Sequence, residues 1–203
     1  MNSRPHIANI RVALGARAQP PKPFQPHPDH ASVALALAGT GDNLQLCLIR
    51  RVEHPSDPWS GHMALPGGRA SPGDRSARAV AEREAREEVS LDLGDAQWIG
   101  ELSELPVRIA GVATSMVLAP FVYHVGPETQ PLTANCEVAE AYWAPLGDLW
   151  DQSNASELRI ERNGVAMMLP AIRFREHLIW GLTHRVLTLF SDVIGLPLPH
   201  LEQ

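Results

Sequence analysis

The segment from Ala77 to Val89 constrains this chain more than any other, because its residue spacing predicts a helix over residues 76–89. At about 100° per residue, one arc of that helix begins with small apolar residues and ends with carboxylates: Ala77, Val80, Ala81, Glu84 and Glu88. Glu87 flanks the arc. The face that the apolar residues mark as buried therefore becomes acidic in its last turns.

Buried carboxylates need partners, since an unpaired charge away from water costs several kcal/mol and neighbouring acids repel one another. A hard divalent cation such as Mg²⁺ or Mn²⁺ would satisfy Glu84, Glu87 and Glu88 together, because it prefers oxygen ligands. Acids at helical spacing also fit an ordinary solvated face, and Arg83 with Glu87 fits a surface ion pair. The helix alone leaves both interpretations open.

The remaining elements are mainly strands. Apolar runs bounded by turn residues predict strands at 32–38, 44–49, 98–102, 114–125 and 138–144. The first two are expected to form a hairpin around a Gly-rich turn. A helix is expected near 7–14 and another at about 174–194, whereas 155–170 has no clear pattern. This order predicts an α/β (α+β) fold.

The N-terminal region differs in composition from the rest. Five prolines, at positions 20, 21, 23, 26 and 28, predict an extended linker after the first short helix. We therefore expect an N-terminal helical and Pro-rich extension over residues 1–29 and one domain over 30–203.

Charge and composition exclude several classes of protein. The net charge is −6 without a basic run, which argues against a nucleic-acid-binding surface. No apolar stretch is long enough to span a membrane, and the N-terminus lacks the features of a secretory signal. Cys47 and Cys136 are expected to be small core residues in a reducing cytoplasm, with a disulfide as the less favoured alternative. An anionic substrate would need something other than bulk charge to attract it, and a divalent metal would serve.

The stretch from Gly68 to Leu91 resembles the Nudix box, G-x5-E-x7-R-E-U-x-E-E-x-G-U, where U is aliphatic. Arg83-Glu84-Ala85-Arg86-Glu87-Glu88 matches every charged position of its core, and a Pro-Gly-Gly turn precedes it. Three positions depart from the pattern. Asp74 replaces the upstream Glu and lies one residue further from Arg83, Ser90 replaces the late Gly, and Ala85 replaces the first aliphatic residue.

Residues outside the box resemble the coenzyme A pyrophosphatase branch of that family. These are the segment from Trp59 to Gly68, the Pro72-Gly73-Asp74 spacing and Trp180-Gly181-Leu182-Thr183. Two features depart from the branch: Leu65 stands where it has Phe, and its second upstream Arg has no counterpart. Trp180 and Thr183 also fit a core role, because they adjoin the apolar stripe of the last helix, and His62 is not assigned a function.

The resemblance implies a Nudix fold, a mixed β-sheet sandwiched between helices, and metal-dependent hydrolysis of a small-molecule diphosphate such as coenzyme A. Glu84 and Glu88 would be the main metal ligands, with Glu87 assisting and Arg83 orienting a glutamate. Gly67 and Gly68 would let the backbone approach the metal and the phosphates. Glu137 is a candidate general base, although a box glutamate could take that role and Glu137 could be an exposed strand-edge acid.

Arg50 and Arg51 are candidates for phosphate contact, with a surface pair at a strand end as the alternative. Other substrates that fit the same helix are ADP-ribose, nucleotide sugars and (d)NTPs. A non-catalytic nucleotide-binding module is a further alternative, which the complete set of acids disfavours. The sequence is compatible with a homodimer and does not specify the oligomeric state.

Overall fold

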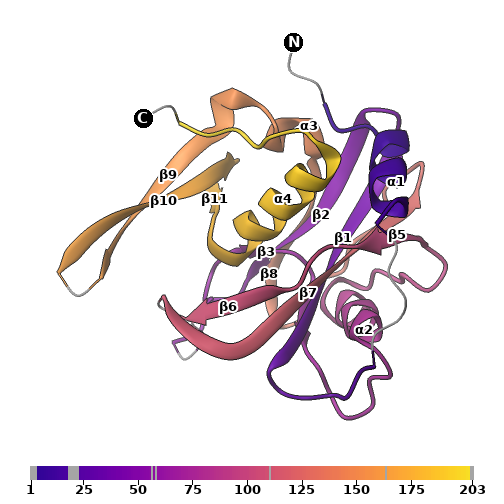
Figure 1. Cartoon of the computed structure of the whole chain (residues 1–203), viewed down its shortest axis with the longest axis horizontal. Coiled ribbons are helices and arrows are strands. Elements are labelled where there is room, and N and C mark those ends of the chain that lie inside the picture. Colours follow the sequence, from indigo (N-terminus) through magenta and orange to yellow (C-terminus); the bar gives the residue numbers. More distant parts are fainter. Residues whose placement is uncertain are drawn as a thin grey trace.

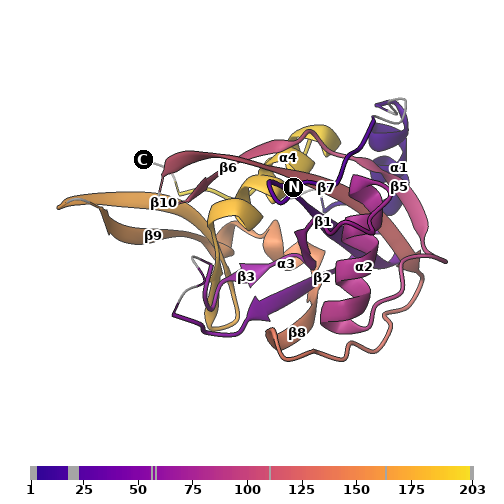
Figure 2. The ribbon, with the colours of Figure 1, turned by 90° about the horizontal axis from the view of Figure 1, so that it is seen from below.

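The computed structural model describes residues 4–17, 23–55, 57, 59–109, 111–162 and 164–201. Two β-sheets and four α-helices make up these segments (Figures 1 and 2). The strands of the main sheet are β1 (His30–Thr40), β2 (Asn43–Arg51), β3 (Met63–Ala64), β4 (Gly67–Arg69), β5 (Gln97–Glu101), β6 (Leu105–Ile109), β7 (Val112–Gly126) and β8 (Val138–Pro145). The second sheet contains β9 (Ala155–Arg162), β10 (Val165–Phe174) and β11 (His177–Ile179).

The main sheet is mixed. Its central path is β3-β2-β1-β7-β5, with β4 paired to β1, β6 to β7 and β8 to β2. Strands β1 and β7 run parallel, while the other pairs are antiparallel. The helices are α1 (Ile7–Gly15), α2 (Ala77–Val89), α3 (Leu146–Leu149) and α4 (Gly181–Ile194), and a 3₁₀ turn spans Gln152–Asn154. Among the described helices, none has the length and apolar character needed to cross a membrane.

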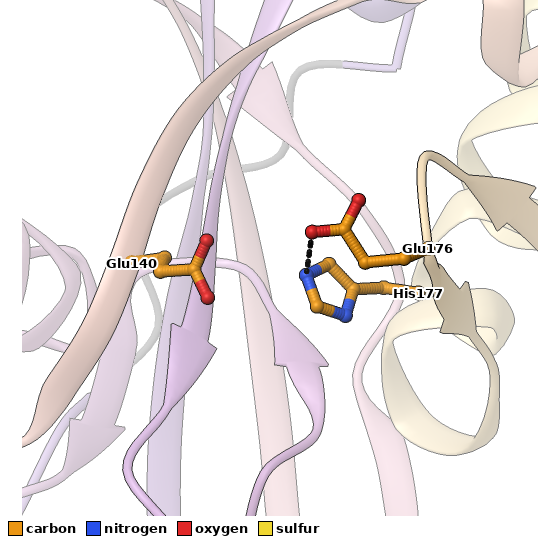
Figure 3. Close-up of side chains that lie close together, drawn as sticks. All are labelled: Glu140, Glu176 and His177. Atoms are coloured by element: carbon orange, nitrogen blue, oxygen red, sulfur yellow. Dashed lines mark ion pairs between the residues drawn. The ribbon is translucent and has the colours of Figure 1, made fainter.

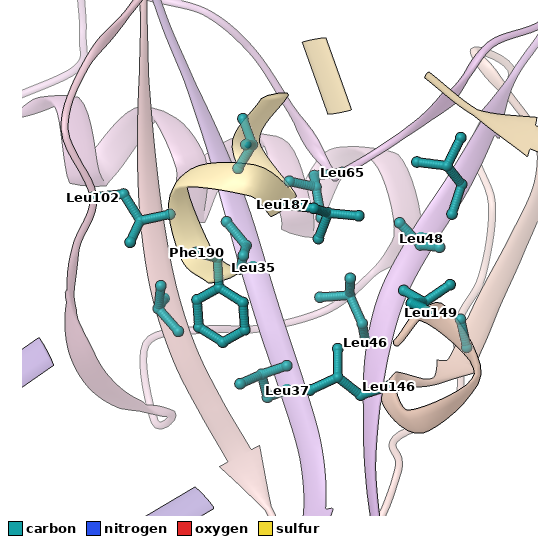
Figure 4. Packing of buried hydrophobic residues seen from close by; sticks show 14 of the residues in the cluster. Leu35, Leu37, Leu46, Leu48, Leu65, Leu102, Leu146, Leu149, Leu187 and Phe190 are labelled. Atoms are coloured by element: carbon teal, nitrogen blue, oxygen red, sulfur yellow. The ribbon is translucent and has the colours of Figure 1, made fainter. Parts of the chain in front are cut away.

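Both faces of the central strands are buried, because alternate side chains enter different cores. Leu35 and Leu37 of β1 pack with Leu46 and Leu48 of β2 in the larger core, which α4 closes with side chains such as Phe190 (Figure 4). The residues between them, including Ala34 and Ala36, face a smaller core that α2 covers. The expected sheet between helices is therefore confirmed.

Small residues let α2 approach the sheet closely. Ala81 and Ala85 of the helix are fully buried against Ala34 and Ala36 of β1 in the smaller core. The helix begins after Ser76, whose hydroxyl accepts a hydrogen bond from the Ala79 N–H, as an N-cap does. The helix predicted at 76–89 is thus observed at Ala77–Val89 and lies directly above β1.

Helix α1 belongs to the larger core. Its residues Ile7, Ile10 and Leu14 are buried there, and the helix packs against β5 and α4. The helix expected at 7–14 is confirmed. Of the predicted proline linker, positions 20 and 21 lie outside the described residues, and the stretch 23–29 forms no helix or strand. The division of the chain at residue 30 stays a prediction.

The prediction of one helix over 174–194 was wrong over its first two turns, residues 174–180. Phe174 ends β10, and residues 177–179 form β11, so α4 begins only at Gly181. Trp180 has an extended backbone and Gly181 has a φ of 63°, so the chain changes direction there before the helix starts. Apolar residues at 174, 178 and 179 fit a helical period by coincidence, because their strands are also buried. The unassigned segment 155–170 contains β9 and most of β10.

The expectation for the cysteines holds for one of them. Cys47 of β2 is buried in the smaller core, whereas Cys136 is exposed, so the assignment of Cys136 as a core residue was wrong. Both thiols are free. Cys136 lies in the loop before β8, between the polar residues Asn135 and Glu137, where the chain follows the surface.

We predict that α1 stabilises the whole domain. Ile10→Ala should lower the free energy of unfolding by about 2–4 kcal/mol, because Ile10 is fully buried and its removal leaves a cavity. Val12→Ala on the same helix is the matched control, since Val12 is 74% exposed, and it should change stability by less than about 0.5 kcal/mol. Denaturant unfolding measures both. Equal stabilities for the two variants would mean that α1 does not contribute to the core in solution.

Candidate active site

The last turns of α2 lie against β4, and this contact positions two carboxylates. The backbone N–H of Gly67 donates a 2.8 Å hydrogen bond to Oε2 of Glu88, whose residue is only 1% exposed. At Gly68, a Cβ atom would come within 2.5 Å of the Glu84 carboxyl carbon. A Cβ at Gly67 would come within 2.3 Å of the Ser32 carbonyl oxygen. Glycines at these positions therefore allow the strand to pass directly beside the acids.

Arg83 links the acids around it. Its Nη1 lies 2.9 Å from Oε1 of Glu84 and 2.9 Å from Oε2 of Glu87, and its Nη2 donates to the carbonyl of Arg69. The Glu87 side chain is more than half exposed, so this acid lies on the flank of the helix. Charge-assisted hydrogen bonds of this kind hold the side chains of Glu84 and Glu87 in defined positions.

Asp74 binds the other side of the same guanidinium. Its two oxygens lie 3.1 Å from Nε and 3.1 Å from Nη2 of Arg83, and it also accepts a 2.7 Å hydrogen bond from the Ser71 N–H. Burial acts to raise the pKa of Asp74, but the hydrogen bonds from Arg83 and Ser71 outweigh it and hold that pKa below its usual value. The shifted acid of the box thus supports Arg83 and does not line the cavity described below.

Glu137 approaches the same acids from a loop. The N–H groups of Thr133 and Asn135 donate to the carbonyls of Val89 and Glu88, which ties the loop to the end of α2. The Asn135 side chain accepts from the Glu137 N–H, and the Glu137 carbonyl accepts from Val52. Glu137 itself is exposed, and its charge raises the pKa values of Glu84 and Glu88.

These elements surround a cavity of about 440 Å³. Its polar wall contains Arg51, Asp57, His62, Gly67, Gly68, Arg69, Glu84, Glu88 and Glu137. Its apolar wall contains Ala31, Val33, Trp59, Met63, Ala64, Leu65, Val107, Met116, Leu118, Trp180, Leu182 and Val186, with Thr183 beside them. The cavity therefore has an acidic side formed by α2 and the Glu137 loop, and an apolar side to which β1, β3, β6, β7 and α4 contribute.

Burial makes the acidic side electrostatically costly. Burial is the largest cause that raises the pKa of Glu88 from 4.5 to about 8; the charges of Glu84 and Glu137 also raise this pKa, and the hydrogen bond from Gly67 and the charge of Arg51 act to lower it. Burial also raises the pKa of Glu84, with Arg83 opposing it. Partly buried acids that repel one another are the arrangement that a bound cation stabilises.

Comparisons with known proteins agree with this geometry. The NUDIX domain family model matches residues 28–162. The chain belongs to the NUDIX family. It is 30% identical over 168 residues to the Nudix hydrolase NudL of Photorhabdus laumondii, which covers 83% of this chain and 86% of that protein. Its identity with NudL of Yersinia pestis is 32% over 158 residues, covering 74% of this chain and 73% of that protein.

The fold has a solved counterpart. A MutT/nudix family protein from Enterococcus faecalis has a TM-score of 0.53 and 18% identity, over 89% of this chain and 67% of that one. The prediction of a Nudix hydrolase with a Nudix fold is therefore confirmed. The coenzyme A pyrophosphatase branch stays a prediction.

Two departures from the Nudix box are explained by the structure. Ser90 adopts a left-handed conformation with a φ of 57°, and its N–H caps the end of α2. Its hydroxyl also donates to the Thr133 carbonyl, so a serine serves where the box has glycine. Ala85 is fully buried where the box has an aliphatic residue, because the helix approaches β1 closely.

The two arginines of β2 diverge, since successive residues of a strand point to opposite faces. Arg51 lines the cavity, where it pairs with Asp57 at 2.8 Å and lies 3.9 Å from Glu88. Arg50 does not line the cavity and pairs with Glu140 of β8 at 2.7 Å. Glu140 belongs to a separate polar cluster with Glu176 and His177, whose candidate ligand atoms lie within 4.8 Å of one another (Figure 3).

Several cavity residues were not assigned a function from sequence. Trp180 is half-buried and its ring centroid lies 4.4 Å from that of His62, so it forms part of the cavity wall rather than the interior of the core. Thr183 is buried and donates to the Met63 carbonyl, as a structural residue does. Asp57 was missed altogether, and only its proximity to Arg51 in the loop could have suggested it.

We predict that Asp74 stabilises the site through its charge. Asp74→Asn should lower the free energy of unfolding at neutral pH by about 1–3 kcal/mol, because it weakens a buried charge-assisted contact with Arg83. The pKa of Asp74 is lowered, so this stabilisation is present above the unfolded-state value of about 3.9 and is lost as pH falls through the folded-state value.

The difference in stability between wild type and Asp74→Asn should therefore begin to shrink below pH ~4 and disappear once the pH is below the lowered folded-state pKa of Asp74. Asp192→Asn on α4 is the matched control, because Asp192 is exposed, and it should differ little from wild type at any pH. A stability difference that is constant with pH would show that the charge of Asp74 is not responsible.

Proposed function

We propose that this Nudix hydrolase cleaves the pyrophosphate bond of a nucleoside diphosphate-linked substrate with Mg²⁺ or Mn²⁺, and that the substrate is coenzyme A or a derivative of it. One observation carries the proposal: Glu84, Glu88 and Glu137, from a helix and a separate loop, meet in one cavity with Arg51 and a glycine strand. Such a set can bind cations and phosphate oxygens at the same place.

The residues present fit a hard divalent cation. All three acids offer carboxylate oxygens, the ligand type that Mg²⁺ and Mn²⁺ prefer. The raised pKa values of Glu84 and Glu88 mark a place where positive charge is needed. Glu84 and Glu88 would hold the metal, with Glu87 assisting from the flank. When bound, the metal neutralises the diphosphate and activates the attacking water.

The protein groups have distinct proposed roles. Arg83, held by Asp74, keeps Glu84 and Glu87 in place. Glu137 is exposed at the rim and close to the metal-binding acids, so it can accept a proton from the attacking water. Arg51 can bind a phosphate oxygen at the cost of its pairing with Asp57. Gly67 and Gly68 keep Cβ atoms out of the space beside the acids.

Arg50 is a weaker candidate for phosphate contact than Arg51. Both its Nε and Nη2 atoms bind the same oxygen of Glu140, and its side chain is outside the cavity. A phosphate contact would therefore need a substrate that extends beyond the cavity along β2 and β8. We retain Arg51 as the phosphate-binding arginine of the pair.

The residues that line the cavity support coenzyme A as the substrate. Coenzyme A carries a long, mostly uncharged arm on one side of its diphosphate, and the apolar wall from Val107 to Val186 offers a surface for such an arm. The rings of Trp59, His62 and Trp180 add a face on which a planar group can pack. ADP-ribose and sugar nucleotides have a polar sugar on the corresponding side, which would leave that wall unpaired.

We expect coenzyme A to be cleaved faster than ADP-ribose, UDP-glucose or dGTP in the presence of Mg²⁺ or Mn²⁺. The products should be a phosphopantetheine and an adenosine bisphosphate, measured by chromatography. Glu88→Gln should reduce kcat/KM by at least about 100-fold, because it removes a charged ligand while preserving the side-chain volume. Glu128→Gln is the matched control, since Glu128 is exposed and outside the cavity.

Different results would contradict the substrate, the catalytic activity or the role of Glu88. Faster turnover of another diphosphate, with the same loss in Glu88→Gln, would contradict coenzyme A and leave pyrophosphate hydrolysis standing. Nucleotide binding without turnover of any of the four compounds would favour a binding module. Full activity of Glu88→Gln would remove Glu88 from the metal site.

We also expect divalent metal to stabilise the folded protein through Glu84 and Glu88. A ligand at about 100 times its dissociation constant contributes about 2.7 kcal/mol to the free energy of unfolding. Saturating Mn²⁺ should therefore raise the melting temperature of wild type and of Glu128→Gln by several degrees, and should raise that of Glu88→Gln far less. An equal rise in all three proteins would place the bound metal elsewhere.

A further inference from the structure

Strands β9 and β10 form an arm that leaves the body of the protein, and both views show it projecting into solvent (Figures 1 and 2). We define the arm as residues 157–161 of β9 and 165–169 of β10. The base of β10 is anchored, since Ala171, Ile172 and Phe174 are buried. Beyond that base, the residues of the arm are exposed or only half-buried.

One face of the arm is apolar. Residues paired across the two strands lie on the same face, so Ile160 with Met167 and Leu158 with Leu169 form one surface. Val165 extends this surface at the tip, where it is 61% exposed, and Met167 is 40% exposed. A hairpin with two strands is marginally stable in water by itself, so an exposed apolar face indicates a partner.

The outer edge of β9 is also open. The order of the second sheet is β11-β10-β9, so within the described part of the chain no strand pairs with the far side of β9. An unprotected edge offers backbone N–H and C=O groups to another strand. The β9 side chains on the face opposite the apolar one alternate in charge: Glu157, Arg159 and Glu161.

We infer that the partner is a second copy of this chain, and that the two β9 edges pair antiparallel about a two-fold axis with Leu158 on the axis. The alternating charges carry this choice, because they complement themselves. With Leu158 opposite its own copy, Glu157 of each chain lies opposite Arg159 of the other. Both pairs then join opposite charges, and the apolar faces of the two arms become continuous.

Other registers are less favourable. For the apolar faces of the two arms to lie on the same side of the joined sheet, the two-fold axis has to pass through a residue that lies opposite its own copy. Near the middle of β9, that residue is Leu158, Arg159 or Ile160. An axis at Arg159 puts the two Arg159 residues opposite each other and Glu157 opposite Glu161, which are like charges. An axis at Ile160 joins Glu161 to Arg159 but overlaps less of β9. The longest overlap with opposite charges is the one centred on Leu158.

This interface does not depend on the proposed function. None of the arm residues lines the active-site cavity. Substitutions in the arm therefore change association without touching the residues assigned to metal or substrate.

Charge-reversal variants of the arm, compared with wild type by sedimentation velocity, test the interface. Wild type should dimerise reversibly. Arg159→Glu and Glu157→Arg should each raise the dissociation constant by at least about 10-fold, because each places like charges opposite at both symmetric pairs. Mixing the two variants should restore a heterodimer, since one chain then carries acids at both positions and the other carries arginines at both. Circular dichroism and thermal unfolding of each variant verify that it is folded.

The result of the mixture is decisive for the register. An axis at Ile160 would leave Glu161 opposite the introduced glutamate, so the mixture would not recover fully. A monomeric wild type at all accessible concentrations would overturn the inference and assign the apolar face to another partner. Variants that dimerise like wild type would overturn it as well.

Disulfide cross-linking tests the axis independently. In a Cys136→Ser background, which removes the exposed thiol, Leu158→Cys should form an intermolecular disulfide on mild oxidation. Arg159→Cys and Ile160→Cys are the matched controls and should cross-link much more slowly. Fastest cross-linking at Ile160 or Arg159 would overturn the assignment of Leu158 to the axis.

Discussion

The close contact between α2 and the strands beneath it organises the whole site. Ala81 and Ala85 meet Ala34 and Ala36 without bulky side chains between them, so the helix lies near β1 and β4. At that distance the Glu88 carboxylate reaches the Gly67 N–H, and Glu84 lies beside Gly68. Larger residues at these positions of α2 or β1 would move Glu84 and Glu88 away from Gly67 and Gly68 of β4.

The contact has an electrostatic cost that the surroundings offset only in part. Glu88 is almost completely buried, and neither the backbone hydrogen bond from Gly67 nor the charge of Arg51, 3.9 Å away, restores its usual pKa. Glu84 is better compensated, because Arg83 binds it directly and Asp74 holds Arg83. The protein thus retains acids that do not stabilise its own fold. Such acids are typical of sites where a charged group is needed for binding or catalysis.

Much of this could be predicted from the pattern of α2 alone. The arc that joins small apolar residues to Glu84 and Glu88 follows from helix geometry, and in the structure Val80, Ala81 and Glu88 of that arc are buried. Ser76 as N-cap and Ser90 in the left-handed position are likewise local, since neighbouring residues decide them. The last helix was mispredicted at its start because a buried strand and a buried helix share the same apolar residues over so short a stretch.

The family, the mixed α/β architecture and the acidic helix could all be read from the chain alone, because they follow from short-range periodicity and from a motif in continuous sequence. Tertiary contacts were needed to show that Arg51 faces the cavity while Arg50 pairs with Glu140, and that Asp74 supports Arg83. The same holds for Glu137 and Trp180, which border the same space as α2. Most of these contacts join residues far apart in the chain, and their geometry depends on how strands register and helices pack, which no local pattern encodes.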